Sequence, residues 1–194
     1  MSVKILNSRD KISAAITGRL KSDFPVVIPY MDIFLRDHWE QITNEPWWLA
    51  ERQTELDFTS KLKVEENLQN KLDLDWILCG LCPSKEWREN NSIEVVSDKI
   101  FLVDSEKDKK TEIIKQPPGG THIKRDEERV KSIDEIDAHV KVVDAKTQIE
   151  EGRLDYIERV VEKFGSDKYI CASILSPFWS SSGFFGITKT YTNL

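Results

Sequence analysis

Apolar residues follow two different periods along this chain, and the two periods predict helices and strands in alternation. A first helix is predicted from Ser8, with apolar residues recurring at the spacing of one helix face. These residues are Ile12, Ala15, Ile16 and Leu20. Residues 31–73 are predicted to be mostly helical, with a break at 44–46, where a proline follows two polar residues. Periodic apolar positions predict two further helices between Ser132 and Gly165.

Three apolar stretches are predicted to be the principal strands, at residues 24–30, 74–80 and 168–174. Pro25 and Pro29 lie near the two ends of the first stretch and indicate that the strand begins and ends there, because proline has no backbone donor. The second stretch is almost continuously apolar, which is typical of a parallel strand covered on both faces.

An antiparallel excursion is predicted between the second and third principal strands, over about residues 92–115. Ile93–Val96 and Lys99–Val103 alternate as hairpin strands, and Thr111–Lys115 is expected to add a third strand. The Pro-Pro-Gly-Gly run that follows predicts a loop over 116–121.

Apolar strands separated by long helices indicate an α/β fold with a parallel sheet. A closed (β/α)8 barrel needs about 250 residues, and this chain has 194. Two architectures therefore compete: a small open α/β sheet with an antiparallel ribbon, or a partial TIM-type barrel of about three parallel strands. We expect the second, with residues 1–194 forming a single incomplete barrel domain that corresponds to its N-terminal portion.

Composition narrows the classes of protein that fit this pattern. The net charge is −6 and the acidity is spread evenly, which argues against nucleic acid as a partner. No apolar run approaches the length of a membrane span, so no membrane association is expected. Three cysteines are too few for a disulfide framework, which favours a cytoplasmic protein with reduced thiols.

Candidate site residues follow from the expected geometry, because ligands of α/β proteins collect at the carboxyl ends of parallel strands. The positions at or just after the carboxyl ends of the predicted strands are Tyr30, Asp32, Cys79, Cys82, Ser176, Phe178 and Trp179. His122 is added because it follows the predicted Pro-Pro-Gly-Gly loop, and loops often carry functional residues. An alternative role for Asp32 is to cap the helix that begins there.

Cys79 and Cys82 form a C-x-x-C motif at the end of the second strand. Such a pair is found in dithiol oxidoreductases, but Pro83 disfavours the helix that normally follows. A structural zinc site needs four ligands, and two thiols supply half of them. We therefore expect both thiols to be reduced and free of metal, either as strand-end residues or as part of a pocket lining.

Several segments together resemble the N-terminal part of the uroporphyrinogen decarboxylase superfamily, which includes the haem-pathway decarboxylase and the cobalamin- or corrinoid-dependent methyltransferases. The matching segments are Ser8–Ile12, Phe24–Pro29, Leu74–Ile77, Pro117–Thr121 and Ile174–Trp179, with Gly183 and Gly186. The resemblance runs nearly from end to end and implies a TIM-type barrel. It is closer to the methyltransferases, because the arginine-bearing motif of the decarboxylase is replaced here by Tyr30–Phe34.

The resemblance implies zinc and a corrinoid for a full-length member, with the zinc ligands in a C-terminal half that this chain lacks. We therefore expect no cofactor on this chain alone and no activity in isolation. The implied partners are a corrinoid protein, a chain that completes the barrel, or a second copy in a homodimer. Other functions left open are a tetrapyrrole decarboxylase-like protein, a half-barrel binding module and a small dithiol oxidoreductase.

Overall fold

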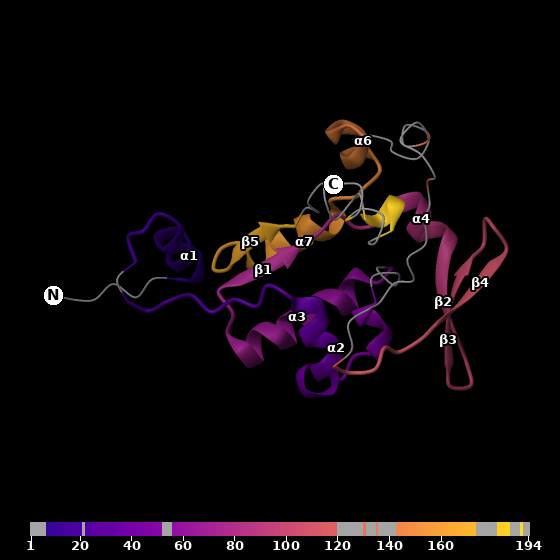
Figure 1. The fold of residues 1–194 in the computed structure, drawn as a ribbon, viewed down its shortest axis with the longest axis horizontal. Helices are drawn as coiled ribbons and strands as arrows, with labels where there is room; N and C mark the ends of the chain where they lie inside the picture. The colour runs from indigo at the N-terminus through magenta and orange to yellow at the C-terminus, as the bar shows by residue number, and fades with distance from the viewer. Residues whose placement is uncertain are drawn as a thin grey trace.

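The computed structural model describes residues 7–20, 22–51, 56–119, 130, 135, 143–173, 182–186 and 191 of the chain. It contains both helices and strands (Figure 1). In chain order they are α1 (Ser8–Ile16), α2 (Met31–Ile42), the 3-10 helix η1 (Trp47–Ala50), α3 (Phe58–Leu72), β1 (Trp76–Cys79), α4 (Lys85–Asn90), β2 (Asn91–Val96), β3 (Lys99–Asp104), β4 (Lys109–Ile113), α6 (Ala145–Glu150), α7 (Asp155–Phe164) and β5 (Tyr169–Ala172).

Strands β1 and β5 pair in parallel, with Trp76 opposite Tyr169 and Cys79 opposite Ala172. This confirms that the second and third predicted strands are parallel neighbours. Along the chain, helix α4, the strands β2 to β4 and the helices α6 and α7 lie between β1 and β5. The fold is therefore mixed α/β, and no closed barrel is formed by the described residues.

The first predicted strand is wrong, because residues 24–30 form no strand. Pro25 and Pro29 remove two of its backbone donors, and the segment makes only one pair of bonds toward β1. The Asp75 N–H donates to the Val26 carbonyl over 2.8 Å, and the Val26 N–H donates to the Asp75 carboxylate over 2.7 Å. The apolar pattern predicted a strand with regular backbone hydrogen bonds. Because of the prolines, the segment is instead bonded to Asp75 through Val26.

The predicted excursion is confirmed as a separate antiparallel sheet of three strands in the order β2–β3–β4. Ser97, in a left-handed conformation with φ of 57°, turns β2 into β3. The third strand begins two residues earlier than expected, at Lys109. Figure 1 shows this sheet at the opposite end of the molecule from α1, away from the parallel pair.

Helix α3 packs into two clusters of buried side chains. At its N-terminal end, Phe58 and Leu62 join Ile77 of β1 and Val160 of α7 in the first core cluster. At its C-terminal end, Leu68 and Leu72 join Ile42 and Leu74 in the second core cluster. The helix is capped by Asp57, which accepts bonds from the Thr59 and Ser60 N–H groups at 2.9 and 3.2 Å. This long helix therefore ties the α2 region to the parallel sheet.

The other face of β1 is less covered than its apolar sequence predicted. Ile77 and Cys79 point into the first core cluster, whereas Leu78 between them is 38% exposed. Since successive strand residues point to opposite faces, the Leu78 side of the sheet is the open one. The prediction of a strand buried on both faces is wrong for this reason.

Candidate functional site

A cleft of about 700 Å³ opens at the carboxyl ends of β1 and β5. The chain from Leu78 to Ser84 and Ser173 after β5 form one wall. The rest is formed by residues of α2, η1, α3, α4 and α7, with Glu51 and Arg153 from the segments beside them. Its apolar lining includes Leu35, Trp39, Val64, Leu78, Leu81 and Trp87. Its charged lining comprises Asp32, Glu51, Lys61, Glu65 and Arg153. A cleft of this volume with mixed walls is of the size that binds small organic molecules.

Two charged residues of α3 lie one helical turn apart in this cleft. The Lys61 ammonium lies over the ring of Tyr156 from α7, with 4.5 Å between the nitrogen and the ring centroid. Glu65 accepts a 2.8 Å hydrogen bond from the Gln69 side-chain amide. Burial raises the pKa of Glu65 above its usual value, and the Gln69 bond and the Lys61 charge offset this rise only in part. The cleft therefore contains a carboxyl group that holds its proton more readily than an exposed one.

The charges nearer to α2 lie around the Arg36 guanidinium. Arg36 has a raised pKa, chiefly because it donates to Asp37 over 2.7 Å, and the negative charges of Asp32 and Glu51 act in the same direction. On the other side, the Arg153 Nε lies 2.5 Å from a carboxylate oxygen of Glu151. Lys61 and Glu65 are thus the charged groups of the cleft that come from the helix packed against the core.

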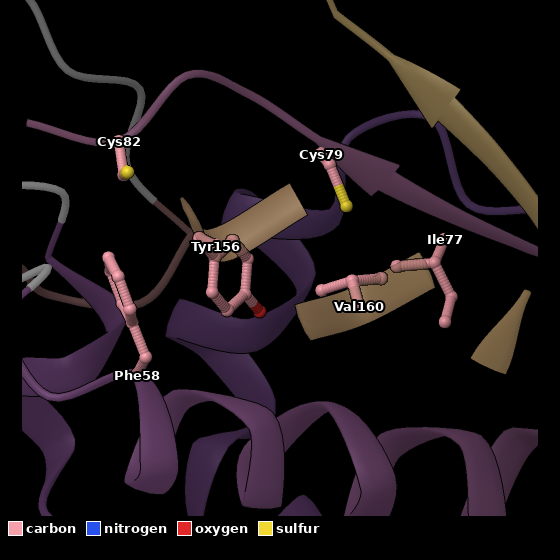
Figure 2. Packing of buried hydrophobic residues seen from close by; sticks show 6 residues of the cluster. All are labelled: Phe58, Ile77, Cys79, Cys82, Tyr156 and Val160. Atoms are coloured by element: carbon pink, nitrogen blue, oxygen red, sulfur yellow. The ribbon is translucent and has the colours of Figure 1, made fainter. Parts of the chain in front are cut away.

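Cys79 is a core residue as well as a cleft residue. Its side chain is 2% exposed and packs in the first core cluster (Figure 2). Burial raises the pKa of the Cys79 thiol to about 12, and the neighbouring Glu65 carboxylate acts in the same direction. A thiol must lose its proton to act as a nucleophile or a metal ligand, so Cys79 is poorly suited to either role.

Cys82 is held by the turn that precedes α7. Its sulfur lies 3.3 Å from the Gly152 carbonyl oxygen and 3.2 Å from that of Arg153. The Arg88 guanidinium donates to the same sulfur over 3.2 Å, and to the Asp155 carboxylate over 2.5 Å. Figure 2 shows the Cys82 sulfur beside Phe58 and Tyr156 and the Cys79 sulfur nearer Val160, with neither pointing at the other. All three cysteines of the chain are free in the structure.

The structure brings three of the predicted site residues to the cleft: Asp32, Cys79 and Cys82. Tyr30 is 70% exposed and does not line the cleft, because it precedes α2 as the residue at its N-cap position. Asp32 lies inside the first turn of α2, so it does not cap that helix. His122, Ser176, Phe178 and Trp179 lie outside the described residues.

Sequence reasoning missed Lys61, Glu65 and Tyr156. Lys61 and Glu65 are four residues apart on a predicted helix, a spacing that is typical of an exposed ion pair. Their place in a cleft follows from the packing of α3 against β1 and α7, which local spacing does not reveal. For Tyr156 there was one indication: the periodic apolar positions of α7 place it next to the partly buried Ile157, on the helix that carries the buried Val160.

The residues present do not fit the zinc that the resemblance implies. Among the described residues, no group of three or more histidine, cysteine, aspartate or glutamate side chains is arranged to hold a metal ion. Neither cysteine at the cleft is placed as a metal ligand. Cys79 is a core thiol with a raised pKa, and the Cys82 sulfur contacts carbonyl oxygens and the Arg88 guanidinium. The described residues therefore offer no ligand set for zinc.

Comparison of the chain with protein-family models, with curated proteins and with solved structures found no match. A search of the described helices found none that combines the length and apolar character needed to cross a membrane.

Proposed function

We propose that the protein binds a small organic molecule in the cleft at the carboxyl ends of β1 and β5. The position of the cleft is the observation that carries the proposal, because parallel α/β sheets bind their ligands at this edge. The mixed lining supports it, since apolar walls with a few charged groups are typical of small-molecule sites. The ligand's apolar part lies against Leu35, Val64 and Leu78, and its polar part faces the charges of α3.

The resemblance to the uroporphyrinogen decarboxylase superfamily supports a role for this cleft in methyl transfer. The chain would then be a partial barrel that works in the cytoplasm with a partner protein that carries a corrinoid. The lining argues against a tetrapyrrole that carries many carboxylates. Its described residues supply two cationic side chains, Lys61 and Arg153, beside three carboxyl groups. Buried carboxylates without cationic partners are costly, so decarboxylation of such a ligand is the weaker proposal.

A second candidate is a binding module whose sheet is completed by another chain. The parallel sheet has two strands within the described residues, and sheet edges pair readily with added strands. A dithiol oxidoreductase is disfavoured by the raised pKa of Cys79 and by the engagement of Cys82 with the turn before α7.

The binding proposal is tested with phenylacetamide, a neutral probe with an apolar ring, followed by ligand-observed NMR and titration calorimetry. Leu81 is 52% exposed and lines the cleft, so the substitution Leu81→Trp should fill its mouth and abolish binding. Val95→Trp is the matched control, because Val95 is 55% exposed on β2 and does not line the cleft. Equal binding by both variants would contradict the proposal.

A further inference from the structure

Strand β4 is an open edge of the three-stranded sheet. It pairs with β3 on one side, and no other strand of the described residues lies along its second side. Its first four residues are exposed, and Figure 1 shows it on the outer side of this sheet, away from α4. The unpaired N–H and C=O groups of such an edge can bond to a further strand.

We propose that two copies of the protein pair through this edge, with their β4 strands antiparallel and related by a two-fold axis at Thr111. The two antiparallel sheets then join into one continuous sheet. The interface is isologous and closed, because each copy contributes the same strand. This dimer is independent of the ligand proposed for the cleft, because no residue of β4 lines the cleft.

Symmetry limits how the two strands can pair. Facing residues of an antiparallel pair lie on the same face of the sheet, and successive residues alternate between the faces. A two-fold axis must therefore stand beside one residue, which then faces its own copy. An axis at Lys109 or Lys110 would bring two ammonium groups together, and an axis at Glu112 would bring two carboxylates together. An axis at Ile113, the last residue, would leave most of the strand unpaired.

An axis at Thr111 makes the charges of the edge complementary. Lys110 of each copy then faces Glu112 of the other, so opposite charges meet on both sides of the axis. The two Thr111 residues face each other, and facing threonines and opposite charges both stabilise paired strands. The other edge strand, β2, carries Glu94 as its one charged residue, so two copies of β2 cannot form an opposite-charge pair. The register at Thr111 is therefore the favoured self-pairing of this sheet.

The existing contacts of these side chains are compatible with the dimer. Lys110 lies 2.8 Å from Glu94 of β2, and Glu112 lies 3.1 Å from Lys99 of β3. These four side chains are 40–58% exposed. An ammonium has three donors and a carboxylate has two acceptor oxygens, so each can take a second partner. Across the interface the signs would alternate, from Glu94 and Lys110 of one copy to Glu112 and Lys99 of the other.

The experiment measures the mass of the full chain by sedimentation in about 50 mM salt, where exposed charges are weakly screened. The edge is five residues long, so the dimer should be weak, with a Kd on the order of 10–100 µM. The wild-type mass should approach twice the 22.5 kDa of one chain as the concentration rises. Lys110→Glu alone and Glu112→Lys alone should each weaken the dimer about tenfold or more, because like charges then face each other at both ends of the interface.

Mixing the two charge variants in equal amounts is the decisive measurement. The strand of the Lys110→Glu variant is acidic at both positions and that of the Glu112→Lys variant is basic at both, so every facing pair again has opposite charges. The mixture should therefore form a heterodimer at least as tight as the wild-type dimer. Lys146→Glu and Glu150→Lys are matched controls, because they reverse an exposed ion pair on α6 and should leave dimerisation unchanged.

Three results would overturn the proposal. A wild-type chain that stays monomeric up to about 1 mM would leave this edge to a strand of another protein. A dimer that neither charge reversal weakens would lie at another surface, and variants that fail to rescue each other would exclude the register at Thr111. Where a charge variant lacks the wild-type circular dichroism spectrum, Thr111→Cys replaces it. Oxidation should crosslink two copies of Thr111→Cys and neither the wild type nor Val95→Cys on β2, and absence of the crosslink would also overturn the proposal.

Discussion

Asp75 is expected to be the polar residue on which the attachment of the N-terminal region depends most. Its side chain is 3% exposed, and one carboxylate oxygen lies 3.2 Å from the Lys11 ammonium of α1. The other accepts the Val26 N–H over 2.7 Å, and the Ser8 hydroxyl also bonds to this carboxylate. The residue thus holds α1 and the 24–28 segment against the start of β1.

Replacing Asp75 by Asn preserves the shape of the side chain and removes its charge. Loss of one partner of a buried ion pair typically costs 3–5 kcal/mol. Lys11 keeps a second contact, 3.5 Å from Asp23, so we expect a cost of about 2–3 kcal/mol. With a urea dependence of about 2 kcal/mol per molar, the midpoint should fall by about 1–1.5 M. Tryptophan fluorescence is a suitable probe, because the chain has six tryptophans.

The matched control is Asp23→Asn, because Asp23 contacts the same ammonium with a side chain that is 65% exposed. Its cost should stay within about 0.5–1 kcal/mol, as is usual for an exposed ion pair. A midpoint for Asp75→Asn no lower than that of Asp23→Asn would refute the reasoning.

The pH dependence gives an independent check on Asp75. Burial opposes its charge, but the bonds from Val26, Ser8 and Lys11 outweigh burial and lower the pKa below the usual 3.8. The stabilisation is therefore fully present above the unfolded-state pKa and is lost as the pH falls through the lower folded-state pKa. The difference in unfolding free energy between wild type and Asp75→Asn should be constant above about pH 5 and should shrink below about pH 4. A difference that grew toward acid pH would contradict this assignment.

Three further predictions concern the thiols, the core and activity. Native Cys79 should not react with Ellman's reagent at pH 8, because burial raises its pKa to about 12. The unfolded protein, without reductant, should give three free thiols, and a count of one would indicate a disulfide. Leu68→Ala should cost about 3 kcal/mol in urea unfolding because Leu68 is fully buried, whereas Ile16→Ala, at a side chain that is 71% exposed, should change stability by less than about 0.5 kcal/mol. The isolated chain should neither decarboxylate uroporphyrinogen nor transfer a methyl group from methylcobalamin to a thiol with zinc present; turnover that is lost in Asp32→Ala would show that the cleft is catalytic by itself.

The parts of the fold that local sequence determines were predicted well. The hairpin strands around Ser97 follow from alternation and a turn, and β1 and β5 follow from short apolar runs between helices. The 24–30 segment shows the limit of this reasoning, because its apolar residues suit a strand while its prolines limit the ladder to the contacts with Asp75. Hydrophobicity alone does not show that the loss of backbone donors at the prolines outweighs the strand preference of the apolar residues.

The residues that line the cleft were singled out from the sequence only in part. Cys79 and Cys82 lie there because the end of β1 can be located from sequence, and the general rule for α/β proteins then applies. Asp32 lies there as part of α2, because residues 24–30 before it form no strand. Lys61 and Glu65 could not be predicted, because their environment depends on which face of α3 packs on β1. Leu78 likewise appeared to be a core residue, and its exposure depends on what covers the second face of the sheet.

The double attachment of α3 has a consequence for how the protein opens. Phe58 and Leu68, near opposite ends of this helix, belong to different clusters, so neither cluster can come apart while the other keeps the helix fixed. The two clusters should therefore melt as one cooperative unit, and the amide protons of α3 should exchange with solvent almost only through global unfolding. Since α3 forms part of the cleft wall, a ligand bound in the cleft should slow hydrogen exchange in both clusters to the same extent.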